Sequence, residues 1–204
     1  MADSVRGRLG CSILVLIVIA LCGCDNAILN YREGEQGLLF SEVYLERDNQ
    51  KNNWLEVYNP TGNPLLLSKF RTSCMLCMNC LSDELVHSGE LLLRPGHRLI
   101  LCLDRERFTQ NWGWKIRAVE VDMLFFGGGF MVLGTYATGD SGIDGFRFGD
   151  PGASEGAASW AGNQALGFCD DGYSWSRNII ITQSGIETSG FRKAIPTPGE
   201  KNNY

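Results

Sequence analysis

The strongest constraint on the fold is a series of nine short runs of apolar or alternating residues, each bounded by turn-forming residues. Turn-forming strings stand between them at 59–64, 94–96, 127–129 and 139–140, and their Gly, Pro, Asn and Asp residues favour tight turns. Runs of this length and spacing predict an all-β fold, an antiparallel β-sandwich. The runs are 38–46, 53–60, 64–70, 90–93, 97–103, 119–126, 130–136, 143–149 and 173–181.

The run 53–60 shows the alternation expected of a strand with two different faces. Trp54, Glu56 and Tyr58 should point to one side, and Leu55 and Val57 to the other, because successive side chains alternate along a strand. The stretch 104–118 is the one place where we expect a short helix. The length suits one domain, which we place at 38–204.

The N-terminus has the layout of a secretory signal peptide. Arg6 and Arg8 precede an apolar run at 12–21, which is shorter than the roughly 20 residues that a stable membrane-spanning helix needs. The ending LCGC at 21–24 resembles the lipobox of bacterial lipoproteins, in which the last cysteine, here Cys24, receives a lipid. An ordinary signal peptide or an uncleaved anchor is the alternative.

This resemblance implies a signal peptide at 1–23, acyl chains on Cys24 and a flexible tether at 24–37. The protein would then be lipid-anchored in the bacterial cell envelope and face the periplasm or the exterior. Asp25 resembles the inner-membrane retention signal of enteric bacteria, but the rule differs between lineages. The choice between inner and outer membrane therefore stays open.

The charge balance narrows the range of partners. The chain has 23 acidic residues against 18 basic ones, a formal net charge of −5 at pH 7. An acidic surface does not release phosphate counterions, so no nucleic-acid partner is expected. Anionic headgroups should also repel the protein as a whole, which makes the lipid on Cys24 the expected membrane anchor.

Seven short motifs occur in the order of the lamin-tail domain, among them WLEVYN at 54–59 and TPGEKN at 197–202. The chain resembles that family across 38–202, which implies an immunoglobulin-like β-sandwich that acts as a non-catalytic binding or scaffold module. An insertion at 74–88 and a glycine-rich loop at 150–172 depart from the family pattern. The other five motifs are 39–43, 67–70, 93–99, 142–146 and 172–177.

The polar residues within these motifs have a structural interpretation. Asn59, Asp144 and Asn202 are expected to close turns through hydrogen bonds from side chain to backbone. Glu56 and Arg177 lie in strands, where a buried charge needs a partner. We therefore expect these two to pair.

Five cysteines besides Cys24 follow the tether. Export to an oxidising compartment favours disulfides, which would tie the 74–80 segment to Cys102 and Cys169 and leave one thiol over. A Cys3His zinc site that includes His87, or free thiols, are the alternatives. We expect no metal and no other cofactor. The candidates in the 74–80 segment are Cys74, Cys77 and Cys80.

Two motifs imitate enzyme or metal sites, yet we predict that the protein is not an enzyme. The string GDSG at 139–142 copies the surroundings of a serine-protease nucleophile, but Ser141 has no histidine in a matching motif. Asp140, Asp144 and Asp150 lack the closing glutamate of a calcium loop. An exported hydrolase that uses Ser141, and a thiol- or metal-handling lipoprotein that uses the 74–80 cysteines, remain the alternatives.

Three tryptophans lie in predicted loops: Trp112 and Trp114 on either side of Gly113, and Trp160 in the glycine-rich loop. Large aromatic side chains are usually buried, so we expect them to cap an open end of the domain. The alternative is a recognition surface for an unknown protein or glycan partner.

Overall fold

A computed structural model describes residues 37–67, 70–74, 83–84, 91–121, 128–135, 142–149, 165–169, 171–183 and 185–202. The fold is all-β with one short α-helix. The strands are β1 (Leu39–Tyr44), β2 (Trp54–Tyr58), β3 (Leu65–Leu66), β4 (Phe70–Cys74), β5 (Asp83–Glu84), β6 (Leu92–Leu93), β7 (Arg98–Cys102), β8 (Ala118–Glu120), β9 (Gly128–Thr135), β10 (Gly142–Gly149), β11 (Ser174–Ser176), β12 (Ile179–Thr182), β13 (Gly185–Thr188) and β14 (Arg192–Ala194).

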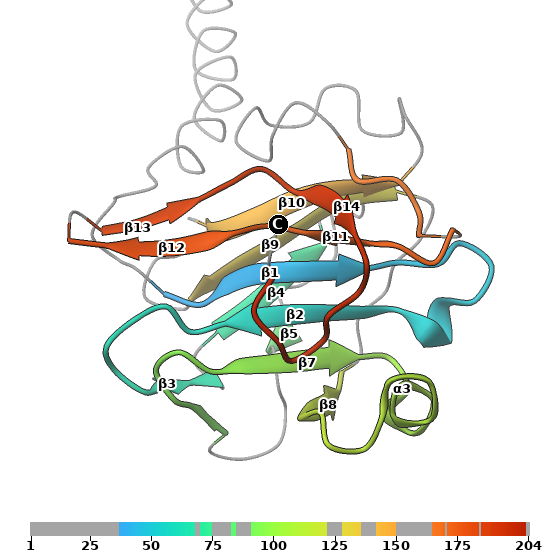
Figure 1. The fold of residues 1–204 in the computed structure, drawn as a ribbon, viewed down its shortest axis with the longest axis horizontal. Coiled ribbons are helices and arrows are strands. Elements are labelled where there is room, and N and C mark those ends of the chain that lie inside the picture. Colours follow the sequence, from blue (N-terminus) through green and yellow to red (C-terminus); the bar gives the residue numbers. More distant parts are fainter. Residues whose placement is uncertain are drawn as a thin grey trace, which may run out of the picture.

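The strands form two larger sheets. A six-stranded sheet has the order β14-β11-β1-β2-β7-β8, and a four-stranded sheet has the order β10-β9-β4-β5. Figure 1 shows the six-stranded sheet in front and the four-stranded sheet behind it. Two small sheets, β12-β13 and β3-β6, complete the fold. Among the described strands, β7 and β8 form the one parallel pair.

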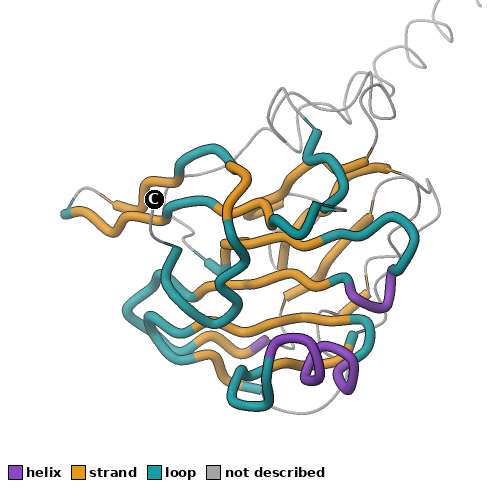
Figure 2. The backbone as a smooth tube through the Cα atoms, turned by 45° about the vertical axis from the view of Figure 1, so that its right-hand side comes forward, coloured by secondary structure: helices purple, strands orange, loops and turns teal. Residues whose placement is uncertain are grey.

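The predicted strand runs agree with the structure, because each of the nine contains strand residues. The helix expected within 104–118 is α3 (Arg105–Trp112), and Asp104 caps its first turn by accepting a hydrogen bond from the backbone N–H of Arg107. Figure 2 shows α3 beside a short 3-10 helix, η1 (Gln50–Asn52), at one end of the six-stranded sheet. Four elements, β5, most of β4, β13 and β14, lie outside the predicted runs.

Apolar side chains fill the space between the two larger sheets. Phe40 on β1 and Phe146 on β10 meet edge to face, with ring centroids 5.1 Å apart. Leu55 and Val57 point into this first core cluster, as the alternation of β2 predicts. Its buried members are Leu38, Phe40, Val43, Leu45, Leu55, Val57, Leu67, Leu93, Leu99, Leu101, Val121, Phe146, Phe148 and Leu166.

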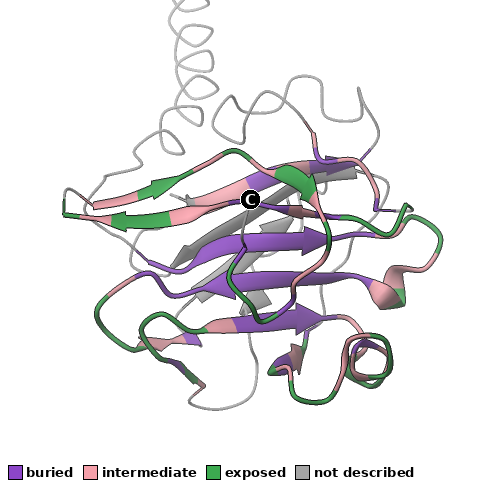
Figure 3. Cartoon of the chain, viewed as in Figure 1, coloured by how far each residue is buried: buried purple, intermediate pink, exposed green. Residues whose placement is uncertain are grey.

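The opposite face of the six-stranded sheet is also covered, so every residue of β1 and β2 is buried (Figure 3). At one end, Trp54 packs edge to face against Phe108 of α3, with centroids 6.0 Å apart. This second core cluster comprises Tyr44, Trp54, Ile100, Cys102, Phe108, Ala118 and Cys169. In the middle, the chain after β14 crosses β1, β2 and β7 (Figure 1).

The predicted leader, 1–23, and all but the last residue of the predicted tether, 24–37, lie outside the described residues. Within the described part, no helix has the length and apolar character needed to cross a bilayer.

Candidate binding site

Two glutamates meet at the centre of the covered face of the six-stranded sheet. Glu42 on β1 and Glu56 on β2 are directly opposite in register, and both are 0% exposed. The Ser41 hydroxyl donates a hydrogen bond to Glu56 Oε1 at 2.5 Å, and Arg98 Nε lies 3.0 Å from the same oxygen. The Ser174 hydroxyl donates to Glu42 Oε1 at 2.5 Å.

Burial is the largest influence on the pKa of both carboxyl groups. It raises the pKa of Glu42 above 4.5 and the pKa of Glu56 to about 7. Hydrogen bonds and the charge of Arg98 oppose the rise at Glu56, whereas the negative charge of Glu42 adds to it. A carboxyl group with such a pKa can exchange a proton near neutral pH, and in enzymes such groups often perform acid–base chemistry.

The C-terminal segment, residues 195–202, closes this pair off. The backbone N–H of Thr197 donates to Glu42 Oε1 at 3.0 Å, and that of Gly199 donates to Glu56 Oε2 at 2.7 Å. Gly199 has a φ of 84°, a conformation that favours glycine. Both carboxyl groups therefore bind the C-terminal segment to the sheet.

Of the polar residues expected to close turns, Asn59 does so as predicted. Asn59 Oδ1 accepts a hydrogen bond from the Thr61 N–H at 2.9 Å. Asn202 has a longer reach than expected, because its Nδ2 donates to the carbonyls of Ser41 at 2.9 Å and Arg177 at 3.2 Å. These two bonds are long-range, so Asn202 joins the C-terminal segment to β1 and to the residue after β11 rather than closing a local turn.

The expected pairing of Glu56 with Arg177 is wrong. Arg177 pairs with Asp144 of β10, whereas Glu56 pairs with Arg98. The two predicted partners point to different neighbours: Glu56 faces the C-terminal segment, and Arg177 reaches toward the four-stranded sheet. Asp144 lies within β10 and also accepts a hydrogen bond from the Phe40 N–H at 2.7 Å, so it joins β10 to β1 rather than closing a turn as expected.

Neither Cys102 nor Cys169 forms the expected disulfide; both are buried thiols. The Cys102 thiol donates to the Val119 carbonyl at 3.4 Å, and Cys169 Sγ accepts from the Leu45 N–H at 3.4 Å. Both pack in the second core cluster, whereas Cys74 ends a strand of the other large sheet. Burial raises the pKa of Cys102 to about 12, which makes it a poor nucleophile.

The two described tryptophan candidates have different surroundings. Trp112 packs against Tyr44 and Trp54, with ring centroids 5.4 and 5.7 Å away, and so caps one end of the sheet as expected. Trp114 is 78% exposed, and the Lys115 ammonium lies 5.8 Å from its ring centroid. Capping is therefore wrong for Trp114, whose ring is open to a partner.

Several predicted site residues lie outside the described residues. They include the lipidation site, the proposed nucleophile and most ligands of the alternative zinc and calcium sites. Among the residues that the structure describes, no three His, Cys, Asp or Glu side chains gather in a way that would hold a metal ion. The undescribed candidates are Cys24, Cys77, Cys80, His87, Asp140, Ser141, Asp150 and Trp160.

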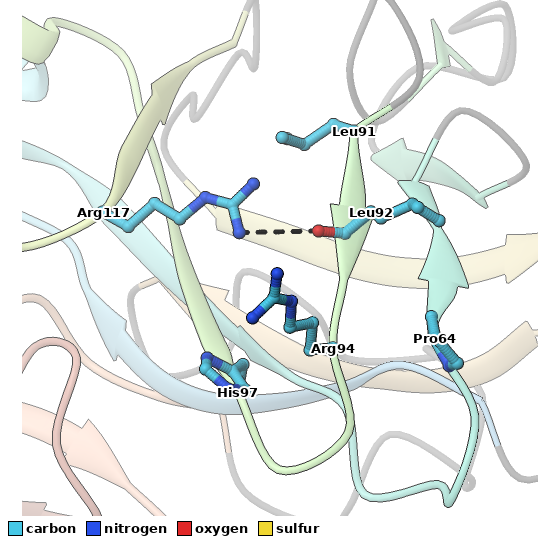
Figure 4. A pocket seen from close by; sticks show the side chains of 6 residues that line it. All are labelled: Pro64, Leu91, Leu92, Arg94, His97 and Arg117. Atoms are coloured by element: carbon cyan, nitrogen blue, oxygen red, sulfur yellow. Dashed lines mark hydrogen bonds between the residues drawn. The ribbon is translucent and has the colours of Figure 1, made fainter.

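An open pocket of about 450 Å³ lies where β3, β6, β7 and β8 come together. Arg94, His97 and Arg117 bring three basic side chains to it, and all three residues are exposed. In Figure 4 the guanidinium groups of Arg94, which follows β6, and Arg117, which precedes β8, approach the same space. The remaining lining is apolar: Pro64, Leu91 and Leu92.

This pocket could not be predicted from local sequence patterns. Arg94 and His97 lie in a motif interpreted as a turn. Arg117 lies 20 residues after His97, beyond α3. The parallel pairing of β7 with β8, in which Ile100 is opposite Ala118, brings Arg117 beside that turn. Because this pairing was not predicted, the convergence of the three basic residues was not predicted either.

A second groove lies beside the turn at 94–97, and Gly96 of that turn is part of its lining. It has a volume of about 750 Å³, and its lining includes Tyr58, Arg98 and Lys201. The hairpin β12-β13 forms one wall, where Ile180 and Ile181 are 55% and 58% exposed. Arg98 is already bound to Glu56 and stacks 4.4 Å from the centroid of the Tyr58 ring.

Comparisons with known proteins give little further guidance. No family model matches the chain, and no curated protein matches it. Among solved structures, it is similar to a DUF4876 family protein from Bacteroides thetaiotaomicron, with a TM-score of 0.46 and 10% sequence identity. That match covers 83% of this chain and 75% of the other.

Proposed function

We propose that this protein is a lipid-anchored lipoprotein of the bacterial cell envelope whose single lamin-tail domain is a non-catalytic binding module. Its domain would be an immunoglobulin-like β-sandwich, tethered through acyl chains on Cys24. The two larger sheets with apolar side chains packed between them support this fold class.

The spatial grouping of the motif residues also supports the family proposal. Residues from motifs far apart in the chain, Glu42, Glu56 and Asn202, come together around the C-terminal segment. Asp144 and Arg177, from two further motifs, form one ion pair. A shared packing role for these residues explains why the motifs occur together.

One observation carries the proposal of binding rather than catalysis. The carboxyl groups best suited to proton transfer, those of Glu42 and Glu56, are 0% exposed and bonded to the C-terminal segment. The open surface instead presents Arg94, Arg117 and the ring of Trp114, side chains that are suited to holding a partner.

Membrane fractionation tests the anchor. We expect the wild-type protein to incorporate labelled palmitate and to stay in the membrane fraction, because more than one acyl chain on Cys24 would anchor it stably. Cys24→Ala should lose the label, and globomycin should block processing of the wild type. Cys22→Ala is the matched control and should behave as the wild type; a Cys24→Ala form that still carries palmitate would refute the anchor.

Site-specific photo-cross-linking in intact cells tests the binding role. A photoreactive amino acid at the exposed position of Trp114 should capture a discrete envelope partner. The same probe at the equally exposed Ile195, 74% accessible, controls for random collisions. Identical products at both positions would contradict a partner site at Trp114.

A further inference from the structure

We infer that the basic pocket formed by Arg94, His97 and Arg117 faces the membrane and binds the phosphate of an anionic phospholipid. This inference rests on the proposed anchoring, and it assigns the anchored domain a definite orientation. The pocket would give the acidic protein a local contact with a membrane that its overall charge disfavours.

The charge of the pocket fits a phosphate group. Arginine presents a planar fork of donors that matches phosphate oxygens, and two such side chains reach the pocket, Arg94 and Arg117 (Figure 4). Arg117 Nη1 makes one long hydrogen bond, 3.5 Å, to the Leu92 carbonyl. None of the described residues that line the pocket is acidic, although the protein carries a net charge of −5.

The apolar part of the lining favours a lipid over a soluble phosphate ester. Leu92 is 50% exposed and lies beside the basic groups together with Leu91 and Pro64 (Figure 4). A phospholipid presents a phosphate next to glycerol and acyl carbons, so it can contact both kinds of surface at once. A soluble ester would leave the leucine in water.

The position of the pocket agrees with the point at which the described chain enters the domain. Leu39, at the start of β1, is opposite Tyr58, and Tyr58 is opposite Arg98. Strands are about 4.8 Å apart, so the chain enters the domain roughly 10 Å from the residue that follows His97. A coil between Cys24 and residue 37 would span about 20 Å, which keeps this end of the domain close to the bilayer.

The neighbouring groove extends the same surface. Ile180 and Ile181 of the β12-β13 hairpin are exposed there beside Lys201, and exposed aliphatic residues with basic neighbours suit a headgroup layer. Glu187 is opposite Ile180 in register and exposed. Its negative charge makes the hairpin less favourable for phosphate than the pocket itself.

Binding of short-chain lipids to the full-length protein in detergent tests the inference. Isothermal titration should show tighter binding of dioctanoyl phosphatidylglycerol than of dioctanoyl phosphatidylcholine. The double variant Arg94→Gln/Arg117→Gln should weaken phosphatidylglycerol binding by about tenfold or more, because it removes two charge-assisted contacts. Arg105→Gln/Arg107→Gln, on α3, makes the same change in charge and should leave binding intact.

Three results would overturn the inference: equal affinity for the two lipids, an equal loss in both double variants, or binding of glycerol 3-phosphate as tight as that of the lipid. The last result would identify a site for soluble phosphate esters. These titrations do not require an acylated Cys24. If the wild-type protein carries no palmitate but still binds phosphatidylglycerol in the titration, the proposed anchor is refuted and the lipid site in the pocket is not.

Discussion

The buried glutamate pair shows how a single residue depends on its surroundings. Like charges directly opposite each other on neighbouring strands destabilise a sheet, yet Glu42 and Glu56 occupy such positions. Burial favours the neutral, protonated form and raises the pKa of Glu56 from 4.5 to about 7. Protonation of a glutamate removes its negative charge, and hydrogen-bond donors surround both carboxyl groups. The repulsion between the two side chains is therefore reduced.

The stability of the protein should fall as the pH rises through this range. The folded state holds the Glu56 proton more tightly than the unfolded chain, so its stabilising contribution is complete below pH 4.5 and lost by about pH 7. This difference corresponds to about 3 kcal/mol in the free energy of unfolding. Glu56→Gln, which cannot ionise, should flatten the profile in urea unfolding measured from pH 4.5 to 8.

Glu106→Gln, on the exposed side of α3, is the matched control and should keep the wild-type pH profile. If the free energy of unfolding of Glu56→Gln changes with pH as steeply as that of the wild type, Glu56 is not the group responsible for the pH dependence.

At the scale of elements, one buried ion pair connects the two larger sheets. Asp144 belongs to β10, and Arg177 follows β11. Their side chains are 10% and 7% exposed. Arg177 Nε also donates to the Phe40 carbonyl at 2.5 Å, and its guanidinium lies 4.8 Å from the centroid of the Phe191 ring. The pair thus positions β10 against β1.

Replacing Asp144 with alanine should destabilise the protein by about 3 kcal/mol or more, because it leaves the Arg177 charge buried without its partner. Thermal or urea unfolding of the purified protein measures the change. Asp171→Ala is the control: it breaks the exposed pair between Asp171 and Lys193, and exposed pairs contribute little. Equal losses in the two variants would mean that burial does not decide the strength of the Asp144 pair.

Across the whole molecule, the C-terminal segment completes the covered face of the six-stranded sheet. Asn202 reaches back 161 residues to Ser41, and the segment supplies the backbone donors of Thr197 and Gly199 to the two glutamates. A Cβ at position 199 would lie 3.2 Å from a methyl carbon of Ile116, so the segment also packs closely against the loop after α3.

Asn202→Ala should loosen this closure. The Arg177 carbonyl would lose its Asn202 donor and the Ser41 carbonyl would retain the Arg177 N–H, and we expect the loss to cost about 1 to 3 kcal/mol. Hydrogen exchange followed by mass spectrometry should then show faster exchange of the amides of Thr197 and Gly199. Lys201→Ala, at the exposed neighbouring position, should not change it; protected amides in the Asn202→Ala protein would contradict a closing role for Asn202.

The sequence by itself determined nine runs that contain strand residues and the two faces of β2. Alternation in 54–58 correctly separated Leu55 and Val57 from Trp54 and Glu56, because a strand places neighbouring side chains on opposite sides whatever its partners. The helix after Asp104 also depends on neighbouring residues alone, because Asp104 caps its first turn.

Only the tertiary structure decided which residues meet across the sheets. The partner of Arg177 depends on the placement of β10 behind β1, and the basic pocket depends on the parallel pairing of β8 with β7. Cys102 and Cys169 remained thiols because their side chains face the helix side of the sheet, away from β4. Local patterns do not encode these contacts, which form only when segments distant in the chain pack together.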